Sequence, residues 1–122
     1  DEERLYKEKS CVSFIKNFPE FTSPFWNMKR NTTNDTGKKV DVILSGMETF
    51  GSAERECDVD IMRNRFETIM NGDYRRKLIE LFGEDRVESE LKEYFNLTFI
   101  PRVGTGIGVT RLIKSMEKEG LL

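Results

Sequence analysis

Residues 40 to 55 read Val-Asp-Val-Ile-Leu-Ser-Gly-Met-Glu-Thr-Phe-Gly-Ser-Ala-Glu-Arg, and this stretch determines the fold that the sequence predicts. The apolar and β-branched residues from Lys39 to Leu44 indicate a strand, and Ser45-Gly46 indicates a tight turn. The residues from Met47 to Cys57 then indicate a returning strand. The stretch therefore predicts an antiparallel hairpin.

Further strands are predicted before this hairpin, and helices after it. Aromatic and β-branched residues predict short strands over 12–18 and 21–28, followed by a polar loop over 29–38. After the hairpin, an apolar period of about 3.6 residues predicts helices. They cover residues 58–70, 74–82 and 85–95, and after a glycine-rich strand a last helix covers 110–119. This order indicates an α+β fold with an antiparallel sheet backed by helices, and a doubly wound parallel sheet is the alternative.

Length and composition fit a single domain over residues 1–122. The 20 Lys and Arg residues nearly balance the 22 Asp and Glu residues, so there is no overall basic field of the kind that indicates nucleic-acid binding. Cys11 and Cys57 have neither the spacing of a metal site nor that of a disulfide framework, which fits a reducing compartment. No window is apolar enough to span a membrane. We therefore expect a cytoplasmic protein with no membrane partner.

A second informative stretch reads Gly104-Thr-Gly-Ile-Gly-Val-Thr-Arg111. Glycines at alternate positions leave one face of a strand bare, so that a flat ligand such as a purine ring has room to lie on it. Tight packing between a strand and a helix is the alternative explanation. Arg111 falls in the first turn of the following helix, where it either reaches outward to a ligand or pairs with a nearby glutamate.

The hairpin carries two acidic residues and an arginine that are candidates for a site. Strict alternation along the returning strand places Glu48 and Ser52 on one face and Arg55 on the other. Glu48 and Arg55 share a site only if the register shifts, and a bulge at Gly51-Ser52 would shift it. Asp41 is expected to lie near the returning strand. Two carboxylates near one point suit magnesium, whereas a solvated aspartate at a strand end is the ordinary alternative.

Three more acidic residues, Glu54, Glu56 and Asp58, follow in the same stretch. We interpret them as a solvated acidic face, because charged side chains are rarely buried without a partner. Asp58 or Asp60 is also expected to cap the helix that follows.

Taken together and in this order, the two stretches resemble the C-terminal half of a class II aminoacyl-tRNA synthetase catalytic core of the aspartate/asparagine subgroup. Residues 104–112 are similar to the third signature motif of that class. Residues 40–55 resemble the hairpin of the subgroup, which carries a glutamate and, seven residues later, an arginine. Residues 14–19 and 23–28 resemble the strand pair that precedes this hairpin, so the resemblance covers nearly the whole chain.

The resemblance implies ATP and magnesium as cofactors. The residues that it assigns to ATP are Asp41, Glu48, Gly104, Gly106, Gly108 and Arg111. Among these, Arg111 is expected to hold the γ-phosphate, Asp41 and Glu48 to bind magnesium, and the bare glycine face to lie along the adenine. Arg111 and Glu48 are the residues expected to be catalytic.

The resemblance also implies an amino-acid substrate, aspartate or asparagine, which is activated as an aminoacyl-adenylate. Arg55 is expected to hold the substrate side chain, and Ser52 is assigned to the same substrate site. A planar guanidinium grips a carboxylate through two hydrogen bonds, which suits this role. The substrate carboxylate attacks the α-phosphate directly, so the absence of histidine from the chain is compatible with the chemistry.

Two residues depart from the pattern of the tRNA ligases. Thr110 stands where these enzymes have an acidic residue before the arginine, and Glu54 stands where the subgroup has glutamine. A small hydroxyl at position 110 resembles instead the ammonia-dependent asparagine synthetases, which share this core and adenylate aspartate without tRNA. The alternatives are therefore tRNA charging, ammonia-dependent asparagine synthesis, a non-catalytic binding module and a bare structural domain.

The first and second motifs of the class have no counterpart in residues 1–122. The sequence thus predicts half of an active site, which alone would not form adenylate. We expect the remaining part of the catalytic domain as a partner, a homodimer of the full-length protein, and tRNA as a further partner if the tRNA-ligase alternative holds.

Overall fold

The computed structural model describes residues 2–22, 25–34 and 36–122, and the predicted hairpin lies at its centre. β2 (Thr36–Leu44) and β3 (Met47–Glu54) are joined by Ser45 and Gly46, whose φ angles are 49° and 84°. Positive φ at both central residues is typical of a type I′ turn, whose twist matches that of the two strands. The turn at Ser45 and Gly46 therefore has the geometry that an antiparallel hairpin requires.

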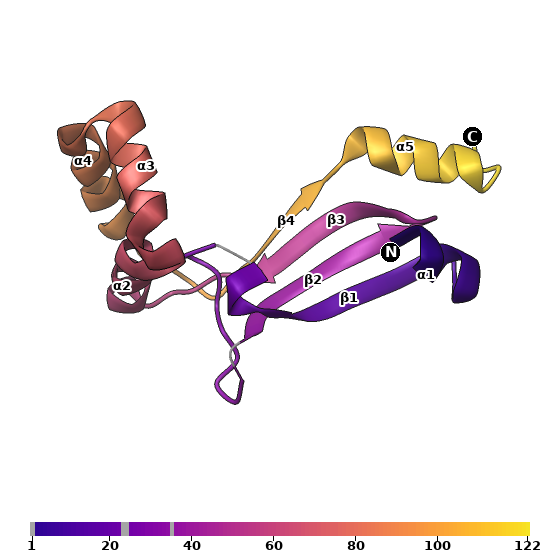
Figure 1. Cartoon of the computed structure of the whole chain (residues 1–122), viewed down its shortest axis with the longest axis horizontal. Coiled ribbons are helices and arrows are strands. Elements are labelled where there is room, and N and C mark those ends of the chain that lie inside the picture. The colour runs from indigo at the N-terminus through magenta and orange to yellow at the C-terminus, as the bar shows by residue number, and fades with distance from the viewer. Residues whose placement is uncertain (1, 23–24, 35) are drawn as a thin grey trace.

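β1 (Val12–Pro19) and β4 (Val103–Ile107) flank the hairpin, and among the described residues the sheet has the order β1-β2-β3-β4. All three pairings are antiparallel, as Figure 1 shows. The α+β fold with an antiparallel sheet is thereby confirmed, and the doubly wound parallel sheet is excluded.

The segment before the hairpin differs from the prediction. β1 forms where it was expected, but the strand predicted over 21–28 is absent from its described residues. A short 3-10 helix, η1 (Glu20–Thr22), follows Pro19, and Met28 makes a single bridge to Arg55. Residues 23 and 24 of the predicted strand, and residue 35 of the predicted loop, lie outside the described residues. Pro19 has no amide hydrogen to donate to a ladder, so β1 ends there, while β2 begins at Thr36, inside the predicted loop.

Three helices lie beyond one end of the sheet, as Figure 1 shows: α2 (Val59–Thr68), α3 (Asp73–Phe82) and α4 (Glu84–Phe95). Asp58 caps α2, because its Oδ1 accepts hydrogen bonds from the backbone N–H groups of Asp60 and Ile61. The helix predicted to reach residue 70 ends at Thr68 instead. Met70 and Asn71 take positive φ angles of 52° and 56° in η2 (Ile69–Gly72), which an α-helix does not accommodate.

Trp26 attaches the segment before the hairpin to these helices. Its ring makes edge-on contacts with Phe66 of α2 at 5.5 Å between centroids, and with Tyr94 and Phe95 of α4 at 5.4 and 6.0 Å. Phe66 is 2% exposed, so the contact lies in the core of this part. Edge-to-face aromatic packing of this kind contributes about 0.5–1.5 kcal/mol per pair beyond the burial of area.

Two helices accompany the opposite end of the hairpin. α5 (Val109–Lys118) was predicted, and α1 (Glu2–Glu8) was not. The Ser45 hydroxyl donates to Glu119 Oε1 at 2.6 Å, and Lys118 Nζ donates to the Ser45 carbonyl at 2.9 Å and lies 3.1 Å from Glu3 Oε1. These four residues form a terminal clasp, which ties both helical ends of the chain to the turn of the hairpin.

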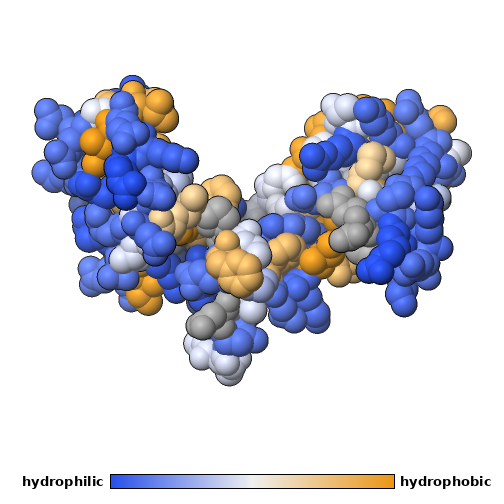
Figure 2. All heavy atoms as spheres, viewed as in Figure 1, coloured by the Kyte–Doolittle hydropathy of each residue, from blue (hydrophilic) through white to orange (hydrophobic). Residues whose placement is uncertain are grey.

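The surface reflects this arrangement. The space-filling view in Figure 2 shows two mostly hydrophilic arms, one carrying α2, α3 and α4 and the other α5, with a hollow between them. One face of the sheet keeps apolar side chains in solvent, and these are Val12, Phe14, Val103 and Ile107, between 44% and 71% exposed. No helix in the described part of the chain has the length and apolar character needed to cross a bilayer.

Candidate active site

A bulge in β3 decides which side chains share a face of the sheet. Val42 pairs with Phe50 and Ile43 pairs with Glu48, so Thr49 is the extra residue in β3. Residues that are directly opposite in a ladder point to the same side, and Asp41 is opposite Gly51. Glu48 consequently joins Asp41 and Gly51 on one face. The expected register shift exists, but it falls at Thr49 rather than at Gly51-Ser52.

Asp41 is the most deeply buried acidic residue of this face, with 4% of its surface exposed. Its Oδ2 accepts a hydrogen bond from Lys39 Nζ at 2.6 Å, and its Oδ1 is buried without a hydrogen-bond partner. A solvated aspartate at a strand end is therefore excluded. Because a buried carboxylate oxygen without a partner costs free energy, this atom is poised for a ligand.

The carboxylates of Asp41 and Glu48 converge above Gly51. A Cβ placed on Gly51 would lie 3.4 Å from Asp41 Oδ1 and 3.6 Å from Glu48 Oε1. Both oxygens are therefore close to one point that only a glycine leaves open. Two carboxylate oxygens, completed by water and phosphate oxygens, are a ligand set that Mg²⁺ accepts. The described residues contain no cluster of three or more His, Cys, Asp or Glu side chains that could hold a metal ion, so this pair would rely on other ligands.

The three glycines of the second stretch have three different surroundings. A Cβ on Gly104 would lie 2.7 Å from Arg55 Nε, so the bare position accommodates the arginine. Gly106 is opposite Gly51 and has nothing within 4 Å of its would-be Cβ. Gly108 precedes α5 and donates its N–H to the Thr49 carbonyl at 2.9 Å. Open space for a flat ligand therefore lies at Gly106, and the other two glycines serve close packing.

Arg111 reaches back from the first turn of α5 to the bulge. Its Nη1 donates to the Glu48 carbonyl at 2.9 Å, and its side chain remains exposed. Within the described residues it forms no salt bridge, so the expected alternative of a pair with a nearby glutamate carboxylate does not hold. The guanidinium thus lies beside Glu48 with its charge uncompensated.

Arg55 continues the same face at the end of β3. Its Nη1 donates to Asn27 Oδ1 over a long 3.4 Å, and its guanidinium lies 6.0 Å from the centroid of the Phe25 ring. The Arg55 backbone N–H donates to the Arg102 carbonyl at 2.9 Å, which extends the pairing with β4. Arg55 and Glu48 therefore share a face, at opposite ends of β3.

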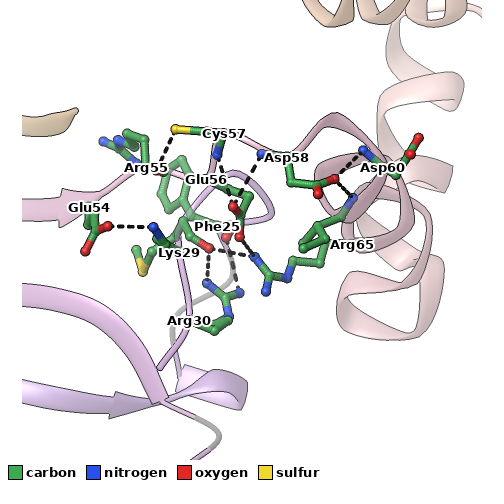
Figure 3. Close-up of polar contacts among 12 residues, drawn as sticks. Phe25, Lys29, Arg30, Glu54, Arg55, Glu56, Cys57, Asp58, Asp60 and Arg65 are labelled. Atoms are coloured by element: carbon green, nitrogen blue, oxygen red, sulfur yellow. Dashed lines mark hydrogen bonds and ion pairs between the residues drawn. The ribbon is translucent and has the colours of Figure 1, made fainter. Parts of the chain in front are cut away.

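The carboxylates on either side of Arg55 are engaged elsewhere, as Figure 3 shows. Glu54 contacts Lys29 at 2.9 Å and Lys38 at 3.0 Å, and the hydrogen bonds from these lysines hold its pKa below the ordinary value. Glu56 contacts Arg65 at 3.0 Å and accepts a hydrogen bond from the Cys57 N–H.

The interpretation of Glu54, Glu56 and Asp58 as a solvated acidic face is wrong. Glu56 is only 7% exposed, and Asp58 serves as the cap of α2. Alternation within β3 could not reveal the reason, because the cations that engage Glu54 and Glu56 come from the segment before β2, from β2 itself and from α2.

Ser52 does not join the other candidates. It is opposite Val40 in β2 and Thr105 in β4, and its hydroxyl donates to the Val40 carbonyl at 2.9 Å. This register places it on the face of the sheet opposite to Asp41, Glu48 and Gly51, so we leave Ser52 out of the candidate site.

Sequence reasoning overlooked two polar residues of this site, Lys39 and Asn27. Lys39 lies two residues before Asp41, so strand alternation could have placed both on one face. Asn27 approaches Arg55 through the bridge at Met28 and through a hydrogen bond from the Glu56 N–H to the Asn27 carbonyl, at 2.9 Å. No periodic pattern in the sequence predicts the contact between Asn27 and Arg55.

The fold and a match to a known family define the class of protein. The family model described as tRNA synthetases class II (D, K and N) matches residues 2–120. The chain belongs to this family. No curated protein sequence matches it.

Solved structures with the same fold include synthetases for aspartate and for asparagine. The asparaginyl-tRNA synthetase of Entamoeba histolytica in complex with asparaginyl-adenylate superposes with a TM-score of 0.74, at 19% identity over 97% of the chain. The asparaginyl-tRNA synthetase of Pyrococcus horikoshii, also complexed with asparaginyl-adenylate, gives 0.69 at 22% identity over 96% of the chain. The aspartyl-tRNA synthetase of Entamoeba histolytica gives 0.63 at 21% identity over 98% of the chain. The chain spans 25%, 25% and 22% of these proteins, respectively.

Proposed function

We propose that the full-length protein activates aspartate or asparagine with ATP as an aminoacyl-adenylate, most simply for tRNA charging, and that this chain supplies part of the active site. The observation that carries the proposal is the convergence of Asp41 Oδ1 and Glu48 Oε1 above Gly51, on the face that also carries Arg55. Membership in the family and the adenylate complexes of two structural neighbours support it.

The residues that the proposal assigns to the site have the following roles in this reaction. An oxygen of the substrate α-carboxylate attacks the α-phosphorus of ATP, and pyrophosphate leaves with the electron pair of the broken P–O bond. Asp41 and Glu48 would hold Mg²⁺, which offsets the charge of the phosphates when it is bound. Arg111 would hold the leaving end of the triphosphate, because a guanidinium binds phosphate oxygens through several hydrogen bonds. Gly106 would leave room beside the adenine, and Arg55 would hold the substrate side chain.

The chain needs a further part of the protein to complete the catalytic domain. The apolar side chains Val12, Phe14, Val103 and Ile107 are exposed on the face of the sheet opposite to the site, as is expected of a surface that another part of a domain covers. We assign the remaining catalytic domain as that partner and a homodimer as the assembly of the full-length protein. A cytoplasmic location goes with this proposal.

Isotope exchange between pyrophosphate and ATP tests the activity. The full-length protein should catalyse exchange only when aspartate or asparagine is added. Exchange that does not depend on an amino acid would contradict the proposal, and so would a complete lack of exchange. In that case a non-catalytic binding module becomes the better account.

A second function, ammonia-dependent asparagine synthesis, is favoured by one residue. Thr110 is exposed in the first turn of α5, directly before Arg111, where the tRNA ligases have an acidic residue. The two functions share the adenylation step and differ in the acceptor. Formation of free asparagine from aspartate, ATP and ammonia would establish the synthetase, whereas transfer of the amino acid to tRNA would establish the ligase.

A further inference from the structure

The Arg55 guanidinium has no salt-bridge partner among the described residues, although a carboxylate flanks it on each side in the sequence. Lys29 engages Glu54 and Arg65 engages Glu56, as Figure 3 shows. Lys38 also contacts Glu54, at 3.0 Å. Glu56 is fixed further, because its Oε1 accepts the N–H of Cys57 at 3.0 Å. Neither carboxylate is available to neutralise the guanidinium between them. In the described residues Arg55 has no salt bridge to any acidic side chain.

The side-chain acceptor that Arg55 does contact is neutral. Asn27 Oδ1 accepts from Arg55 Nη1 at 3.4 Å, and the Asn27 backbone is fixed by the Glu56 N–H at 2.9 Å. A carboxylate in place of this amide would form a shorter, charge-assisted bond and would cancel the positive charge. The amide orients the guanidinium without cancelling its charge. At 3.4 Å the bond is long, so a stronger acceptor can replace it.

Packing restricts the same guanidinium from other sides. Gly104 has no side chain where Arg55 Nε passes, and a Cβ there would lie 2.7 Å from this atom. The ring of Phe25 lies 6.0 Å from the guanidinium carbon. The side chain is therefore positioned by a bare glycine and a neutral amide.

We propose that Asn27 is a positioning residue that holds Arg55 without neutralising it, and that the site therefore prefers a substrate with a side-chain carboxylate, aspartate, to one with a carboxamide, asparagine. This inference rests on the proposed adenylation and on Arg55 as the group that contacts the substrate side chain. A carboxylate accepts two parallel hydrogen bonds from a guanidinium, whereas a carboxamide offers one oxygen and turns an N–H₂ donor toward the N–H donors of the arginine.

Pyrophosphate exchange with aspartate and with asparagine, measured on the full-length protein, tests this preference. The wild type should show a kcat/KM for aspartate at least about tenfold above that for asparagine. Asn27→Asp should lower kcat/KM for aspartate by about tenfold or more, chiefly through KM, because the introduced carboxylate occupies and neutralises Arg55. For asparagine the change should stay below about threefold, so that the preference is lost or reversed.

Two further variants separate charge from packing. Asn27→Ala removes the contact but adds no charge, so aspartate should lose about threefold in kcat/KM while remaining the preferred substrate. Asn64→Asp adds the same charge on the exposed side of α2 and should leave both substrates unchanged. Circular dichroism melts of all variants report whether they are folded, and Asn27→Ala alone tests the positioning role if Asn27→Asp does not fold.

The outcomes distinguish this inference from the proposed function. Exchange that favours asparagine in the wild type would overturn the inference and leave the adenylation intact. Equal losses for both substrates in Asn27→Asp, or unchanged kinetics in Asn27→Ala, would also overturn it, because Asn27 would then act only on the fold or not at all. Exchange with neither amino acid would overturn both proposals.

Discussion

Two arginines of the helical part and two at the candidate site have opposite surroundings. In α3 and α4, Arg75 contacts Glu67, Glu84 and Glu88, and Arg86 contacts Glu90 at 2.8 Å. On the sheet face, Arg55 contacts an amide oxygen and Arg111 contacts a backbone carbonyl. The same residue type therefore joins helices in one region and keeps uncompensated charge in the other, and the difference marks the sheet face as the region suited to an anionic ligand.

The largest effect is expected where the two regions meet, at the buried pair of Arg65 and Glu56. Arg65→Ala leaves the Glu56 carboxylate, in a residue 7% exposed, without its cation. Removing one partner of a buried pair costs about 3–5 kcal/mol, so the free energy of unfolding in urea should fall by that amount. The double variant Arg65→Ala/Glu56→Ala should lose clearly less than the sum of the single variants. Additive losses would mean that the pair is not coupled.

Arg55→Ala tests the uncompensated charge directly. Removal of the group that binds a substrate carboxylate should cost about 2–5 kcal/mol, which is roughly a 30-fold to several-thousand-fold loss of kcat/KM for aspartate in pyrophosphate exchange. The matched control is Arg86→Ala, which breaks an exposed pair in the helical part worth about 0.3–0.5 kcal/mol. If both variants retain normal exchange, Arg55 does not contact the substrate.

Gly104→Ala and Gly106→Ala sharpen the comparison within β4. The methyl group of an alanine at position 104 would meet Arg55 Nε at 2.7 Å and displace the guanidinium. The methyl group of an alanine at position 106 would have no other atom within 4 Å. A displacement of about 1 Å can lower a rate by roughly 100-fold, so Gly104→Ala should reduce kcat/KM for aspartate by about 10- to 100-fold. Gly106→Ala should leave the KM for aspartate unchanged and raise the KM for ATP. If Gly104→Ala instead raised the KM for ATP and Gly106→Ala raised the KM for aspartate, the amino acid and the ATP would have to be assigned to the opposite ends of the site.

The smallest effect concerns Glu54, which flanks Arg55 and is half-buried at the end of β3. Hydrogen bonds from Lys29 and Lys38 hold its pKa below the ordinary value of 4.5. A lowered pKa in the folded state stabilises the protein above the ordinary pKa, and this stabilisation is lost as the pH falls through the folded-state value. The difference in melting temperature between the wild type and Glu54→Gln should therefore be present at neutral pH and disappear in strong acid. A difference that is independent of pH would argue against the charge interaction.

The local signals in the sequence predicted the elements of the sheet well. Ser45 and Gly46 predicted the turn, and the alternate glycines predicted β4, because both features depend on residues that are neighbours in the sequence. The strand expected over 21–28 did not form in its described residues, since its aromatic residue Trp26 packs against α2 and α4 instead. Tertiary packing therefore overrode the local preference.

The candidate site was predictable only in part. The need for a bulge between Glu48 and Arg55 followed from alternation, but its position at Thr49 depends on the pairing with β2, which the sequence does not encode locally. The burial of Glu56 was not predicted either, because its partner Arg65 lies on α2. Alternation identifies the residues of a face, while the charges that compensate them come from distant segments.

The terminal clasp has a consequence for how the chain folds. Lys118 and Glu3 are separated by 115 positions in the sequence, whereas the turn at Ser45 closes between adjacent strands. Loop closure over such a distance costs more entropy than a hairpin, and contacts of large separation slow folding. The hairpin can therefore form early, but the clasp closes only after residues 118 and 119 have been synthesised. Because Arg111 belongs to the same helix, α5, the face with Asp41 and Glu48 gains this cation only after α5 has been synthesised and has packed against the hairpin.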